Sequence, residues 1–234
     1  MEFNIVLVHS PIVGPSTWAP VSRELRGREI RTIVPTLPSI IDMSTPIWAQ
    51  HAQAVARRLE SIPNYQPIVV VGHSGAGPLL PAIGASSPHP VAAYVFVDAS
   101  LPHGGRSQLE EMEANSPVLL SSLSSYLEAG GLYPEWTAKD LSEIVPEGVR
   151  QRVLADIRPM GLPFFKETMP YYPNWPEIPC GYIKFSQAYT IPAEKARKYG
   201  WEYDEFDAGH FHMLVDPEAV TNSLINLIGL LCPQ

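Results

Sequence analysis

Residues 68–77 read IVVVGHSGAG, and this stretch decides the fold. The apolar, β-branched run at its start predicts a strand buried on both faces, and the small residues after it predict a tight turn into a helix. Such a turn holds its central residue in a strained conformation and exposes that side chain at the edge of a sheet. We therefore predict that Ser74 is a nucleophile, with Ala76 in place of the last glycine of the G-x-S-x-G pattern.

Two other interpretations of this turn compete with a nucleophile, and the sequence disfavours the second. A glycine-rich turn can carry a serine that takes no part in chemistry. A phosphate-binding loop needs a lysine after its glycines, and none follows Gly77.

Strand and helix signals alternate on both sides of the turn. Apolar runs predict strands at 3–9, 30–34, 68–71, 91–97, 182–185 and 201–206. Apolar residues at helical spacing predict helices at 18–26, 46–62, 193–199 and 216–231, with a short helix after the turn. This alternation predicts an α/β fold with a mostly parallel, six-stranded sheet and helices on both faces.

Residues 101–178 interrupt the alternation, because they contain helical patterns but no convincing strand. The stretch follows the fourth strand, at the edge where open α/β sheets bind ligands. We expect a helical cap inserted into a single domain whose core is formed by residues 1–100 and 179–234. Aromatic residues of the cap either line a pocket or form the cap's own core, and we expect two or three of them to face Ser74. These aromatic residues are Tyr126, Tyr133, Trp136, Phe164, Phe165, Tyr171, Tyr172 and Trp175.

The composition restricts the partners of the protein. The 234-residue chain has a formal net charge of −8, which disfavours binding to nucleic acid and to anionic membrane surfaces. No apolar run reaches the roughly 20 residues of a membrane span, and residues 1–8 lack the features of a secretion signal. Cys180 and Cys232 lie far apart without metal-ligand spacing; a disulfide between them stays open. We expect a reduced, cytoplasmic protein that acts on a small molecule without a metal or cofactor.

A histidine that follows the last strand is the expected base. In serine hydrolases with a strand-turn-helix nucleophile the order along the chain is serine, acid, histidine. Residues 208–214 read AGHFHML, and we predict that His210 is the base, with His212 as the alternative. The spacing of these two histidines also suits a metal, but no carboxylate or cysteine pattern accompanies them. His73 is interpreted as structural.

Taken together, these motifs resemble the plant methylesterase and hydroxynitrile lyase branch of the α/β-hydrolases and its bacterial relatives. The resemblance rests on VLVH at 6–9 with Trp18 nine residues after the histidine, GHS at 72–74, VFVDASLP at 95–102, YI at 182–183, IP at 191–192 and GHFHML at 209–214. It implies the α/β-hydrolase fold over nearly the whole chain. It also implies that Ser74 and His210 are catalytic and that the cap shapes a pocket for a small acyl or aromatic substrate.

The chain departs from this branch at the triad acid. The branch carries its acid in the loop before the IP motif, where this chain has Ala188 and no carboxylate. Asp98 is the best candidate instead, because it ends the strand next to the nucleophile strand, and some haloalkane dehalogenases look similar in this respect. A structural or helix-capping role is its alternative. Asp207 and Glu205 are further options that lie close to the histidine in sequence.

A second departure concerns the oxyanion donors. Family members place a residue with a free backbone N–H where this chain has Pro11, which has none. The Gly75 N–H supplies one donor, and we expect the Ile12 N–H or the Ser10 hydroxyl to replace the other. A missing donor would cost about 3 kcal/mol of transition-state stabilisation.

Three functions follow from these residues. The first is a hydrolase of esters, thioesters or lactones acting through an acyl-Ser74 intermediate, with His210 as base and Asp98 orienting it. The second is a lyase, cyclase or other rearranging enzyme that uses the same residues as acid and base. The third is a ligand receptor without enzymatic activity.

Overall fold

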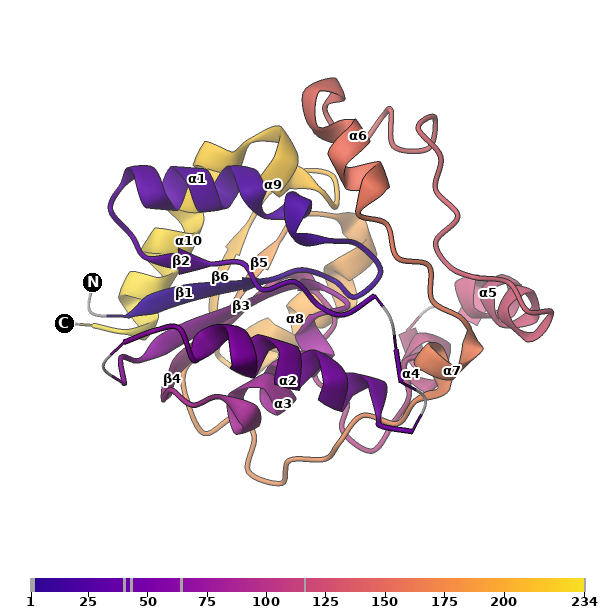
Figure 1. The fold of residues 1–234 in the computed structure, drawn as a ribbon, viewed down its shortest axis with the longest axis horizontal. Helices are drawn as coiled ribbons and strands as arrows, with labels where there is room; N and C mark the ends of the chain where they lie inside the picture. The colour runs from indigo at the N-terminus through magenta and orange to yellow at the C-terminus, as the bar shows by residue number, and fades with distance from the viewer. Residues whose placement is uncertain (1–2, 40, 43, 64, 116, 234) are drawn as a thin grey trace.

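A parallel six-stranded sheet forms the centre of the protein in the computed structural model, which describes residues 3–39, 41–42, 44–63, 65–115 and 117–233 (Figure 1). The strands are β1 (Asn4–Val8), β2 (Thr32–Ile33), β3 (Ile68–Ser74), β4 (Val91–Ala99), β5 (Cys180–Lys184) and β6 (Glu202–Glu205). Their order across the sheet is β2-β1-β3-β4-β5-β6, with every neighbouring pair parallel. The predicted parallel α/β sheet is confirmed.

Helices cover both faces of the sheet, because successive apolar residues of the buried strands point to opposite sides. One face carries α1 (Ala19–Gly27), α9 (His212–Val215) and α10 (Pro217–Leu231) around a core that includes Leu7 and Val71. The other carries α2 (Ile47–Leu59), α3 (Leu80–Ser86) and α8 (Thr190–Lys198) around a core that includes Val8 and Val70. Short 3-10 helices lie at Pro15–Thr17, Gly77–Leu79 and Gln187–Tyr189.

Several elements differ in length from the prediction. The strand predicted at 30–34 pairs with β1 only through Thr32 and Ile33, because it is an edge strand that ends before the prolines at 35 and 38. Conversely, β3 and β4 extend to Ser74 and Ala99, so both reach the edge of the sheet. The helix predicted from 193 starts at residue 190, because a proline is tolerated in a first turn.

Between β4 and β5 the chain forms α4 (Gln108–Asn115), α5 (Pro117–Glu128), α6 (Glu147–Ala155) and α7 (Leu162–Lys166). Figure 1 places this insertion beyond the strands, on the side away from the two chain ends. It has a small core of its own, formed by Leu109, Leu127, Met160 and Phe165. Its contacts with the rest of the molecule are made through loops as well as helices.

Some aromatic residues of the insertion pack in its own core, and others pack against the core of the sheet. Phe165 belongs to the insertion's own core, with Tyr133 packed against it. Trp136 contacts Phe211 edge-on, at 6.0 Å between ring centroids. Most of these aromatic rings therefore serve packing.

The structure also bears on membrane spans and on the two cysteines. No helix in the described part of the chain is long and apolar enough to cross a membrane. Cys180 and Cys232 are both free thiols.

Candidate active site

Ser74 lies at the end of β3, where the backbone turns sharply toward α3. Its φ angle is +58°, in the left-handed region that residues with a Cβ rarely adopt. Gly77 is required just after the turn, because a Cβ there would lie 1.9 Å from the Ser100 carbonyl oxygen. Strain of this kind persists only where the surrounding structure enforces it, and it is typical of functional sites.

Asp98 lies beside this turn because the pairing of β3 and β4 is irregular at their ends. His73 pairs with Val97, whereas Ser74 pairs with Ala99, so Asp98 is the extra residue of a bulge. Its φ angle is +41°. The bulge re-aims a side chain that would otherwise follow the alternation of the strand.

The carboxylate of Asp98 reaches the loop after β5. Its Oδ1 accepts the N–H groups of Phe185 and Ser186, each at 2.9 Å, and its Oδ2 accepts the Ser186 hydroxyl at 2.6 Å. The Nδ1 of His210 lies 2.7 Å from the same Oδ2. Burial alone would raise the pKa of Asp98, but the hydrogen bonds from His210 and Ser186 outweigh it and lower the pKa. The carboxylate that contacts His210 thus comes from the end of β4 and not from the loop that holds Ala188.

This carboxylate determines how His210 is protonated. A carboxylate only accepts hydrogen bonds, so the Nδ1 of neutral His210 carries the proton and its Nε2 is left as an acceptor. An imidazole with a free Nε2 acceptor is the form that can take a proton from a hydroxyl.

The other candidates for acid and base lie elsewhere. The carboxylate of Glu205 accepts the hydroxyl of Tyr203 at 2.6 Å, and Asp207 is exposed. The ring of His212 packs against two phenylalanine rings, with centroids 5.5 and 4.9 Å away. Among the described residues, Asp98 is the carboxylate that lies within hydrogen-bond distance of the His210 ring.

His73 packs against the His210 ring and hydrogen-bonds the His210 backbone. It is fully buried, and its Nε2 donates to the carbonyl of His210 at 3.0 Å, with the two rings 4.4 Å apart. Burial, with His210 nearby, lowers the pKa of His73 well below its usual value, so its ring is neutral at pH 7. A neutral ring avoids placing a second cation beside His210.

Tyr189, at the end of the 3-10 helix after β5, is a site residue that the sequence patterns do not identify. Its hydroxyl lies 3.0 Å from Ser74 Oγ, and its ring stacks on His210 at 5.0 Å with an interplanar angle of 8°. Burial raises the pKa of Tyr189, so the phenol is protonated. Within the described part of the chain, the Ser74 hydroxyl therefore pairs with Tyr189 and not with His210.

The loop after β1 lies against the nucleophile turn. A Cβ on Gly75 would lie 3.0 Å from Ser10 Oγ and 3.6 Å from Pro11 Cδ. His9 holds this loop, because its Nδ1 bonds the Ser10 carbonyl at 2.8 Å. Ile12 is partly buried among apolar residues, and its carbonyl accepts a backbone N–H from the insertion at 3.0 Å. Ser10 and Pro11 are thus the loop residues that the structure brings to Gly75.

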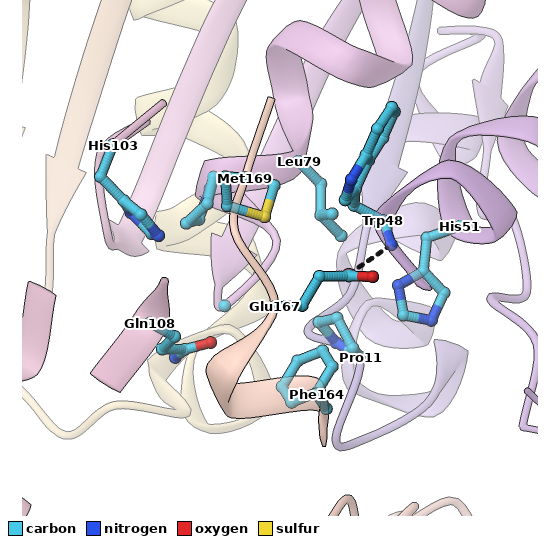
Figure 2. Close-up of a pocket in the computed structure, with 11 residues that line it drawn as sticks. Pro11, Trp48, His51, Leu79, His103, Gln108, Phe164, Glu167 and Met169 are labelled. Carbon is cyan, nitrogen blue, oxygen red and sulfur yellow. Dashed lines mark hydrogen bonds between the residues drawn. The ribbon is translucent and has the colours of Figure 1, made fainter. Parts of the chain in front are cut away.

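A small cavity (Figure 2) adjoins Gly75 and Pro11, and neither His210 nor Tyr189 is among the residues that line it. Phe164 is the aromatic residue of the insertion that lines this cavity. No cluster of three or more potential metal ligands occurs among the described residues.

Comparisons with known proteins give consistent relatives. A model described as "Alpha/beta hydrolase family" matches residues 5–222. Methylesterase 8 of Arabidopsis thaliana is 26% identical over 222 residues, which cover 88% of this chain and 79% of that protein. Methylesterase 2 of the same plant is 30% identical over 138 residues, which cover 55% of this chain and 52% of that protein. The chain thus spans about half the length of Methylesterase 2.

Solved structures share the fold over nearly the whole chain. Polyneuridine aldehyde esterase has a TM-score of 0.72 at 17% identity, covering 97% of this chain and all of that one. Tomato methylketone synthase I, complexed with beta-ketoheptanoate, has a TM-score of 0.74 at 16% identity, covering 99% of each chain. At these identities the likeness establishes the fold alone.

Proposed function

Because the chain belongs to the α/β hydrolase family, we propose that it is a serine hydrolase that cleaves an ester, thioester or lactone of a small molecule. The observation that carries this proposal is the 2.7 Å contact between Asp98 and His210 beside the strained turn of Ser74. The methylesterase relatives support the ester as substrate class. Residues 1–100 and 179–234 would form the catalytic core, and residues 101–178 the cap over it. The two free thiols suit the reduced, cytoplasmic location expected for it.

The reaction proceeds through an acyl-enzyme. The Nε2 of His210 takes the Ser74 proton as Oγ bonds to the substrate carbonyl carbon. The imidazolium, stabilised by the Asp98 carboxylate, then gives that proton to the leaving group as its bond to the carbonyl carbon breaks. Water repeats the sequence, which releases the acid and restores Ser74.

Two donors stabilise the oxyanion in this scheme. The Gly75 N–H is the first. The second is the Ser10 hydroxyl or the Ile12 N–H, and the position of Ser10 Oγ against Gly75 favours the hydroxyl.

A second candidate function is favoured by one observation: the Ser74 hydroxyl bonds Tyr189 instead of His210. In a lyase, cyclase or rearranging enzyme, His210 would act as base and the phenol of Tyr189 as acid, with no covalent intermediate. The lack of an N–H at Pro11 fits a reaction that builds up less charge on the substrate oxygen.

Labelling with an activated phosphonate distinguishes these functions. The hydrolase should carry the label on Ser74 alone, seen by mass spectrometry. Ser74→Ala should abolish both labelling and turnover of p-nitrophenyl and methyl esters. Full ester turnover by Ser74→Ala would exclude the acyl-enzyme.

Tyr189→Phe separates the first function from the second. It removes the hydroxyl bonded to Ser74 but keeps the ring on His210. A hydrolase should then be labelled as fast as the wild type or faster and keep its esterase activity. If the Tyr189→Phe variant loses turnover but is still labelled, the acid–base enzyme is favoured. If the wild-type protein shows neither labelling nor turnover, it is a receptor.

A further inference from the structure

The cavity beside Gly75 and Pro11 is lined by several polar side chains, and ring nitrogens of two of them, His51 and His103, have no hydrogen-bond partner among the described residues. Figure 2 shows Glu167 between Trp48 and Phe164, with His51 on one side of it and His103 and Gln108 on the other. Its free volume is about 20 Å³, which is room for one water-sized group.

His51 is the most unusual of these residues. It is fully buried on α2, and neither of its ring nitrogens has a hydrogen-bond partner within the described part of the chain. Burial, with His9 nearby, lowers the pKa of His51 to about 4; the Pro38 carbonyl acts in the opposite direction but does not meet hydrogen-bond geometry. The ring is therefore neutral at pH 7 and offers one donor and one acceptor. Because an unsatisfied buried polar group is costly, such a ring indicates a ligand.

His103 offers an acceptor to the same cavity. Its Nδ1 lies 3.2 Å from the Leu101 carbonyl, which can only accept, so Nδ1 carries the proton. Burial lowers the pKa of His103, so the ring is neutral, and its Nε2, which has no partner among the described residues, presents a lone pair.

Glu167 adds negative charge. Its two carboxylate oxygens accept the N–H groups of Ile47 and Trp48, at 2.6 and 2.9 Å, and each keeps further accepting capacity. No lysine or arginine is among the described residues that line the cavity. The charged residue of the lining is thus a carboxylate, which disfavours an anion in the cavity, while Arg158 and Arg106 act on the two histidines from outside the lining.

We propose that this cavity binds a hydroxyl group on the acyl part of the substrate, so that the protein prefers esters of short hydroxy acids. This inference rests on the proposed function. The hydroxyl proton satisfies a lone pair of His103 or Glu167, and the hydroxyl oxygen accepts from His51. The acyl part enters here because its carbonyl oxygen faces the Gly75 N–H, whereas the leaving group departs toward His210, which is not part of the cavity.

The test compares esters that differ in one group. Methyl 3-hydroxybutanoate and methyl 3-methylbutanoate have a hydroxyl and a methyl at the same carbon, and monomethyl glutarate carries an anion. The wild-type protein should show a kcat/KM roughly ten- to hundredfold higher for the hydroxy ester than for the methyl isostere, and lower still for the anion. This comparison needs no variant.

His51→Leu should move the ratio toward the methyl isostere by about tenfold or more, because it replaces both polar atoms by an apolar side chain of similar size. His89→Asn is the matched control. His89 is also buried, and its Nδ1 has no partner in the part of the chain that the structure describes, but it lies outside the cavity, so its replacement should leave the ratio unchanged.

The outcomes separate this inference from the proposed function. If Ser74 is labelled and esters are cleaved, but the hydroxy ester is no better than its isostere, the cavity proposal is overturned and the hydrolase stands. An equal shift of the ratio by His89→Asn also overturns it. If Ser74 is not labelled and no ester is cleaved, both are overturned.

Discussion

Asp98 receives hydrogen bonds from a neighbouring loop and from His210, so its replacement should separate its catalytic from its structural effect. Asp98→Asn keeps the side-chain shape but presents an N–H₂ donor toward the proton on His210 Nδ1, which forces the wrong tautomer. We expect kcat for p-nitrophenyl acetate to fall by roughly 10⁴-fold while circular dichroism remains unchanged. Asp207→Asn, on an exposed carboxylate of the same region, should stay within about threefold. The opposite ranking would remove Asp98 from the mechanism.

Single site residues can be predicted from the sequence where a local motif marks them. Ser74 and His210 are identified by a turn and by chain order, and Asp98 by the adjacency of two strands. The bulge that aims Asp98 at the loop after β5 depends on strand register, which no residue pattern encodes. Tyr189 could not be predicted from the sequence, because only the path of the loop after β5 brings its hydroxyl to Ser74.

At the scale of elements, the loop after β1 holds the residues that we propose as the second oxyanion donor. Pro11→Gly restores an N–H, and we expect up to about a hundredfold gain in kcat for p-nitrophenyl acetate if the natural set of donors is incomplete. If the Ser10 hydroxyl already serves as the second donor, Ser10→Ala should lose about as much. Its loss should then be smaller in the Pro11→Gly background.

A double-mutant cycle over these two positions checks the idea. Additive effects would show that Ser10 and the residue at position 11 do not serve the same oxygen. The Ile12 N–H would be the second donor if the wild-type kcat is already high, Pro11→Gly lowers it, and Ser10→Ala leaves it unchanged.

The existence and order of the elements could be predicted, but not all of their lengths. Apolar, β-branched runs mark the buried strands clearly. Edge strands such as β2 depend on a single neighbour, and strand ends at the site extend through the polar residues His73 and Asp98, which an apolar pattern does not include. The insertion shows only weak patterns because its core is small.

For the whole molecule, buried neutral histidines make stability depend on pH. The pKa is lowered by burial to about 4 for His9 and His51, and well below its usual value for His73. Their unfolded pKa is about 6.5, so below that pH the unfolded chain binds more protons than the folded one. Stability is therefore complete above pH 6.5 and is lost as the pH falls toward 4. For three such groups the slope approaches about 4 kcal/mol per pH unit.

Denaturant unfolding at pH 7.5, 6 and 5 measures this slope. His51→Gln should make it shallower by about a third, because one of the three groups is gone. A free energy of unfolding that stays constant from pH 7 to pH 5 would contradict the prediction.

Arg158 and Asp156, near the end of α6, join the insertion to the loops after β1 and β2. The backbone N–H of Arg158 donates to the Ile12 carbonyl, its guanidinium to the Leu37 carbonyl, and the carboxylate of Asp156 accepts the Ser16 N–H. An engineer who exchanges the insertion to change substrate range would also alter the anchors of the loop that holds Ser10 and Pro11. A grafted insertion that retains these two residues should change selectivity and leave the turnover number unaltered. A graft that loses them should change both.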